Sequence, residues 1–126
     1  MKRFLLAVAT LCLIGSACML NVAHYRRATG ELRHQLAVAV AHARAGEYPQ
    51  AAAAMEKLKD DFDARLPHFN MTTNHMELEA VMDTLARTLA GLRDMNLPLF
   101  FNESSLLDKQ LHHIYVAERM ALQNIF

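Results

Sequence analysis

Residues 74–96 read NHMELEAVMDTLARTLAGLRDMN, and this stretch decides the fold. One histidine and five apolar residues recur there in alternating steps of three and four positions: His75, Leu78, Met82, Leu85, Leu89 and Leu92. Such steps return to the same side of an α-helix, so the pattern predicts a helix with one continuous packing face. A face of that length needs other helices against it.

The composition favours helices and a single domain. The 126 residues include 4 Gly, 3 Pro and no Trp, and apolar residues make up 53% of the chain. Few helix breakers among many alanines, leucines and methionines predict an all-α protein. The 13 basic residues balance the 13 acidic ones. They form no cluster of the kind that nucleic acid requires, so we expect no nucleic-acid partner.

The first segment predicts a membrane contact. Two basic residues precede an uncharged run from Phe4 to Leu20. At about 1.5 Å per residue the run spans roughly 26 Å, and residues up to Ala23 complete the ~30 Å core of a bilayer. We therefore expect residues 1–23 to be a signal-anchor that contacts the lipid bilayer through residues 4–23.

Other fates of this segment stay open at the level of sequence. The small residues Gly15-Ser16-Ala17 allow cleavage before Cys18. Cys18 is also the residue that a lipoprotein would modify, although Gly15 stands where a branched aliphatic residue is expected. Basic pairs flank both ends of the apolar run, at Lys2-Arg3 and Arg26-Arg27. We expect a single pass through the cell membrane, with the N-terminus inside and the bulk of the chain extracytoplasmic.

Residues 24–126 predict an antiparallel up-down bundle of about four helices. The expected helices are His24–Ala45, Pro49–Leu66, residues 74–96 and Pro98–Gln123. Glycine and proline mark the turns near Gly46 and Asn96. Pro67 is expected to close or kink the second helix, which leaves residues 68–73 as a connector. The first bundle helix either continues the anchor as one rod or bends at Gly30.

Each remaining helix has its own predicted packing face. The positions are Tyr25, Leu32, Leu36, Ala39 and Ala43; Ala52, Met55, Leu58, Phe62 and Leu66; and Phe100, Ser104, Leu107, Leu111, Ile114, Glu118, Ala121 and Ile125. The spacing matches that of residues 74–96, so four faces of one kind can meet in a common core.

Two polar residues interrupt these faces at matching levels. If the last two helices form a hairpin that turns near Met95, His75 and Glu118 occupy one layer. A carboxylate next to an imidazole favours the charged imidazolium. In a site without water, each group also provides the hydrogen-bond partner that the other needs. We expect a buried polar pair that fixes register, with a proton- or metal-responsive site as the functional alternative.

A metal site has a weak basis in the sequence. No two of the seven histidines are three or four positions apart, which is the spacing of ligands on one helix face. His75 and Glu79 form an i, i+4 pair, and Glu118 could join them. Without a stronger constellation we expect no metal, no cofactor and no catalytic residues.

Short motifs along residues 24–126 resemble the bacterial domain-of-unknown-function family numbered 4363. They are Glu47-Tyr48 before Ala51–Ala54, Phe62 where the family often has Trp, His75 with Glu77, His113-Ile114-Tyr115 before Glu118, and Asn124-Ile125-Phe126. The Pro98-Leu99-Phe100-Phe101 segment departs from the family pattern. The resemblance implies a small membrane-anchored helical protein and supplies no catalytic residues.

These observations favour a membrane-anchored, non-catalytic module at the outer face of a bacterial membrane. Its packing faces without a chemical site indicate an interaction or structural role, through a protein partner or self-association. The alternative is a ligand- or metal-sensing bundle that uses His75, Glu79 and Glu118.

Overall fold

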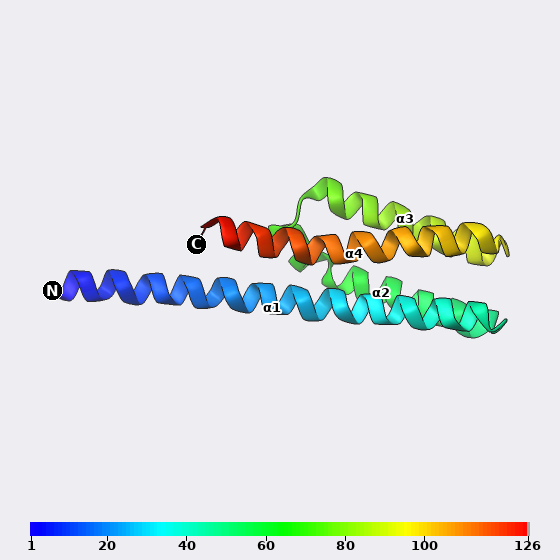
Figure 1. The fold of residues 1–126 in the computed structure, drawn as a ribbon, viewed down its shortest axis with the longest axis horizontal. Helices are drawn as coiled ribbons and strands as arrows, with labels where there is room; N and C mark the ends of the chain where they lie inside the picture. The colour runs from blue at the N-terminus through cyan, green and yellow to red at the C-terminus, as the bar shows by residue number, and fades with distance from the viewer. Residues whose placement is uncertain (126) are drawn as a thin grey trace.

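The computed structural model describes residues 1–125; the side chains of Thr72, Leu122 and Ile125 and all of Phe126 lie outside that description. Within residues 1–125 the chain forms four α-helices and no strand, which confirms the all-α prediction (Figure 1). The helices are α1 (Lys2–Arg44), α2 (Tyr48–Thr72), α3 (His75–Arg93) and α4 (Leu97–Ile125).

Helix α1 is a continuous rod of 43 residues, about 65 Å long at 1.5 Å per residue. Of the two sequence-based alternatives the rod is correct, because Gly30 lies inside the helix. The large apolar side chains between Phe4 and Leu20 are exposed. The second half has seven buried residues, Tyr25, Ala28, Thr29, Leu32, Leu36, Ala39 and Ala43, and all five predicted positions are among them. One helix thus has an unpacked apolar half and a packed half.

The turn into α2 lies where glycine was expected to stop the first helix. Gly46 has a φ of +77°, a backbone conformation that a residue with a Cβ adopts only with strain. The N–H of Glu47 donates to the carbonyl of His42 at 2.9 Å, which satisfies one of the last carbonyls of α1. Pro49 follows in the first turn of α2, where its missing N–H costs nothing.

Helix α2 continues past Pro67, so the predicted end at Leu66 and the predicted connector are wrong. The helix reaches Thr72, where the N–H of Thr73 still donates to the carbonyl of Phe69 at 2.8 Å. Phe69 is fully buried against the rings of Phe62 and Tyr25. Burial of a large aromatic side chain contributes about 2–3 kcal/mol, which offsets most of the ~3 kcal/mol that an internal proline costs.

Helix α3 begins at its predicted cap, and its packing face is wider than predicted. The side chain of Asn74 accepts a hydrogen bond from the N–H of Met76 at 2.8 Å. The buried residues are Leu78, Val81, Thr84, Leu85, Thr88, Gly91 and Leu92. His75 and Met82, both predicted on this face, are exposed. The face turns toward Val81 because α3 packs against α2 as well as α4.

Helix α4 follows a tight turn at Met95, which has a φ of +56°. Five positions of its predicted face are buried: Phe100, Ser104, Leu107, Leu111 and Ile114. Glu118 is half-buried and Ala121 is exposed, while the side chain of Ile125 lies outside the described part. The apolar face of α4 therefore weakens over its last two turns.

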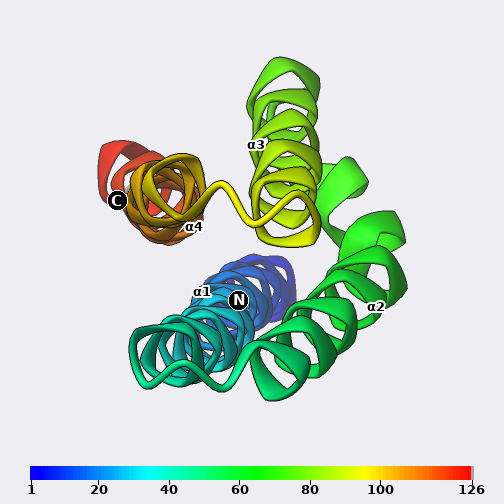
Figure 2. The same cartoon turned by 90° about the vertical axis from the view of Figure 1, so that its right-hand side faces the viewer.

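The four helices enclose one core cluster of buried residues. Helix α1 packs against α2 and α4, and α3 packs against α4, with a smaller contact between α2 and α3 (Figure 2). In Figure 1 the first part of α1 projects beyond the other helices, and the C-terminal end of α4 lies at the same end of the bundle. We call this end, at the base of the projecting rod, the rod end.

Candidate functional site

A polar cluster occupies the rod end, where the packed half of α1 begins. Its members are Asn21, His24 and Tyr25 of α1, His68 of α2 and Glu118 of α4. The cluster lies among α1, α2 and α4. Helix α4 brings Glu118 there because its buried face continues from Leu111 and Ile114 by one further step of four positions.

Glu118 is the only acid in this polar cluster. Its Oε1 accepts a hydrogen bond from Nδ2 of Asn21 at 3.3 Å. Partial burial raises the pKa of Glu118, and the nearby His68 lowers it by a smaller amount. The fold therefore favours the protonated carboxyl group more than water does.

The aromatic part of the cluster joins α1 to the end of α2. The rings of His24 and His68 meet edge to face, with centroids 4.6 Å apart, and Tyr25 lies 5.3 Å from His68. The hydroxyl of Thr73 donates to the fully buried Tyr25 hydroxyl at 3.2 Å. Nε2 of His68 is buried and has no hydrogen-bond partner among the described residues. Such an atom is expensive to desolvate, so it marks a place for a water molecule or a small polar ligand.

The predicted buried pair of His75 and Glu118 is wrong, because a different histidine lies near Glu118. His75 lies on the surface, with 77% of its side chain exposed, and pairs with Glu79 at 3.0 Å. The imidazole that acts on Glu118 belongs to His68. His68 directly precedes Phe69, which continues the buried face of α2. Sequence analysis missed His68 because it interpreted Pro67 as the end of that helix.

That prediction assumed a register between the last two helices, with a turn near Met95, and this register is close to correct. Two polar contacts cross between α3 and α4, Glu77 with His113 and the ion pair of Arg87 with Glu103, each at 3.2 Å. Both connect residues at nearly the levels expected for a turn near Met95. The hairpin register was therefore predictable, whereas the rotation of α3 about its own axis was not.

The described residues contain no group of three or more His, Cys, Asp or Glu side chains that could hold a metal ion. His75 and Glu79 meet on the exposed face of α3, while Glu118 binds Asn21 of α1. A shared site of His75, Glu79 and Glu118 is therefore wrong.

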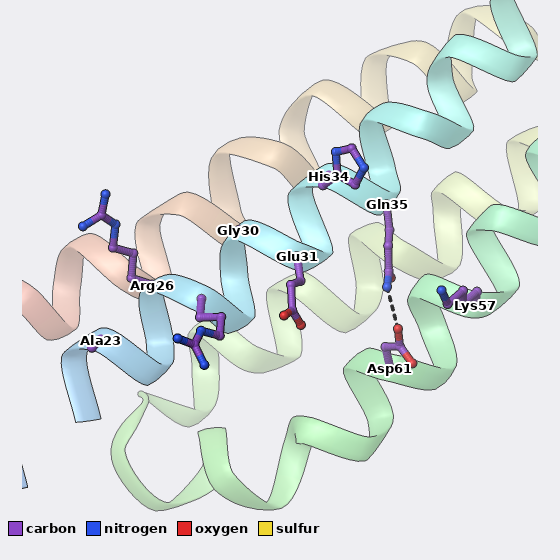
Figure 3. A pocket seen from close by; sticks show the side chains of 9 residues that line it. Ala23, Arg26, Gly30, Glu31, His34, Gln35, Lys57 and Asp61 are labelled. Carbon is purple, nitrogen blue, oxygen red and sulfur yellow. Dashed lines mark hydrogen bonds between the residues drawn. The ribbon is translucent and has the colours of Figure 1, made fainter. Parts of the chain in front are cut away.

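An open groove runs along α1 and α2 above the cluster (Figure 3). Two polar contacts join the helices there: Gln35 donates to Asp61, and Arg65 binds Glu31. Arg26 points away from Asp61, toward the other side of α1. The groove thus holds matched polar contacts that tie α2 to α1, and it offers no nucleophile with an adjacent base.

The fold and these contacts define a class: a small all-α domain whose first helix is long and apolar enough to be a membrane span or a signal sequence. Nothing in its described residues indicates catalysis. The chain belongs to the family described as Domain of unknown function (DUF4363), whose model matches residues 20–125. The resemblance to that family is thereby confirmed. No curated protein and no solved structure matches the chain.

Proposed function

We propose that this chain is a single-pass bacterial membrane protein that presents an antiparallel up-down helical bundle at the outer face of the membrane. The observation that carries the proposal is the exposure of nine large apolar side chains in the first half of α1: Phe4, Leu5, Leu6, Val8, Leu11, Leu13, Ile14, Met19 and Leu20. No other described helix covers them. Their transfer from water to lipid is favourable by on the order of 10 kcal/mol.

The continuity of α1 supports a retained anchor. The same helix that carries the apolar half supplies seven buried residues to the core. A cut before Cys18 would leave Asn21 and Tyr25 within the first turns of a new N-terminus, where helices fray. A rigid rod without a linker also holds the bundle at a fixed height above the membrane.

The role we assign to the bundle is non-catalytic: it binds a protein partner or a second copy of itself. This role is supported by the described residues, none of which indicates catalysis, while ion pairs such as Arg33 with Asp108 and Arg87 with Glu103 join neighbouring helices. The sensing alternative that used His75, Glu79 and Glu118 is wrong, since His75 and Glu79 meet on the exposed face of α3 while Glu118 contacts Asn21 of α1.

Membrane insertion is tested by flotation of the full-length chain with liposomes and its resistance to alkaline extraction. The wild type is expected to stay with the membrane. A Leu11→Arg and Leu13→Arg double variant is expected to leave it, because each central arginine costs about 2.5–3.5 kcal/mol. An Ala52→Arg variant of α2 is the control. Ala52 was predicted on the packing face of this helix, but that prediction is wrong, because Ala51 is buried and Ala52 is exposed. A wild-type chain recovered unprocessed in the soluble fraction would refute the proposal.

Sidedness and partner are tested in intact cells. With Cys12 and Cys18 changed to serine, a cysteine at the exposed Asp83 of α3 is expected to react with a membrane-impermeant maleimide. Labelling only after lysis would place the bundle inside. Cross-linking in the membrane is expected to capture a partner or a self-complex, and monomers alone under several cross-linkers would contradict the interaction role.

A further inference from the structure

The lengths of the helices place the end of α4 beside the apolar half of α1. Asp108 of α4 binds Arg33, and Glu118 lies level with Asn21. Helix α4 continues to Ile125, so its last two turns run past Asn21 toward the N-terminus of α1. Figure 1 shows this end of α4 alongside α1, beyond the turn between α2 and α3. If α1 spans the bilayer through residues 4–23, the level of Asn21 and Glu118 is close to the bilayer surface. The segment of α4 around Arg119 then lies at headgroup depth, and the last turn of α4 reaches deeper.

A second groove lies at that depth between α1 and α4. Arg26, Thr29 and Arg33 line it from α1, and Tyr115 and Arg119 from α4. The guanidinium of Arg119 lies 5.7 Å from the centre of the Tyr115 ring, which holds the charge at the wall of the groove. Tyrosine and arginine are the side chains that mark membrane–water interfaces.

The charge of this second groove is positive. Arg33 is neutralised by Asp108, to which its Nε and Nη2 donate at 2.8 and 3.2 Å. Arg26 and Arg119 have no acidic partner within 4.0 Å among residues 1–125. The hydroxyl of Thr29 is buried and already donates to the carbonyl of Tyr25 at 2.8 Å. The two guanidinium groups and the tyrosine hydroxyl form a donor set that fits a phosphate group, which accepts several charge-assisted hydrogen bonds.

We propose that the groove between Arg26 and Arg119 binds the phosphate of an anionic phospholipid headgroup. This inference rests on the proposed membrane anchorage, which brings the groove to the headgroups. Free phosphate has the same chemistry, but the negative surface potential of anionic lipid attracts the arginines and repels a free anion. The lipid would lock the bundle to the membrane at the rod end, in one rotational orientation about α1.

The test uses the full-length chain in nanodiscs of phosphatidylcholine with or without phosphatidylglycerol. Native mass spectrometry counts the phosphatidylglycerol molecules that stay bound, and their apparent Kd is measured. An Arg26→Gln and Arg119→Gln double variant is expected to bind on the order of 30-fold more weakly, the change that roughly 1 kcal/mol per arginine near the surface gives. Arg93→Gln, an exposed arginine at the far end of α3, is the matched control and should change nothing.

Three outcomes separate the hypotheses. A chain that fails to enter nanodiscs refutes the anchorage itself. A chain that enters and binds phosphatidylglycerol equally with and without the two arginines refutes the groove alone. If inorganic phosphate stabilises the chain against unfolding in phosphatidylcholine nanodiscs and the chain shows no preference for phosphatidylglycerol, the site binds a free anion. That result would overturn the proposal of a lipid headgroup. Equal melting temperatures in phosphatidylcholine exclude a folding defect in the double variant.

Depth is measured independently through tryptophan, which the chain lacks. Met120 of α4 and Met95 in the α3–α4 turn are similarly exposed, at 54% and 52%. Met120→Trp is expected to be quenched by brominated lipid and to emit at shorter wavelength than Met95→Trp. Equal, unquenched emission from both variants would show that the end of α4 stays in water and would overturn the proposal.

Discussion

Two glycines inside helices allow a matched test of how tightly α3 packs on α4. A Cβ added to Gly30 of α1 meets no atom within 4 Å outside its own helix backbone. A Cβ added to Gly91 of α3 would lie 3.0 Å from the backbone nitrogen of Phe100 and 3.3 Å from its Cα. The same Gly→Ala change therefore meets open space in one helix and the backbone of a neighbouring helix in the other.

The expected magnitudes follow from this difference. Alanine favours a helix over glycine by about 1 kcal/mol, and Gly30→Ala should gain that amount. Gly91→Ala has the same gain but must move the first turn of α4, and such overpacking costs about 1–3 kcal/mol. We expect Gly30→Ala to raise the melting temperature by about 4–8 °C and Gly91→Ala to leave it unchanged or lower it.

The assay is thermal unfolding of the full-length variants in mild detergent, followed by circular dichroism at 222 nm. The comparison between two Ala variants cancels effects of the detergent and of the apolar half of α1. Equal stabilisation by both changes would refute the reasoning, because it would mean that α4 approaches α3 less closely at Gly91 than the structure has it.

Three further predictions test the rod end and the start of α3. Glu118→Gln should be at least as stable as wild type at pH 7. The fold raises the pKa of Glu118, so the protonated carboxyl group stabilises the folded wild type below the unfolded pKa. This stabilisation is lost as pH rises through the folded pKa. The stability advantage of the variant should therefore shrink toward pH 4 in pH-dependent unfolding curves. Phe69→Ala should lose about 3–5 kcal/mol in denaturant unfolding, while Met71→Ala, at a position 81% exposed, should lose less than 1 kcal/mol. Asn74→Ala should cost about 1 kcal/mol by removing the cap of α3, measured in the same way.

The candidate site was only partly accessible from the sequence. Glu118 stood out because a carboxylate interrupted an apolar face, and the structure places it in a polar cluster. Its partners were missed, since Asn21 lies in the stretch assigned to the anchor and His68 in the stretch assigned to a connector. Proline propensity is a local preference, and burial of Phe69 against Tyr25 and Phe62 overrides it.

The sequence by itself determined the elements: four helices, their turns at Gly46 and Met95, and the apolar half of α1. These follow from interactions between residues close in the chain, such as hydrogen-bond ladders, caps and periodic apolar spacing. The tertiary structure alone decided the rotation of α3, which exposes His75 and buries Val81, and the overlap of α4 with the apolar half of α1. Apolar residues at helical spacing indicate that a helix has a packing face. The width and direction of that face depend on how many neighbouring helices pack against the helix.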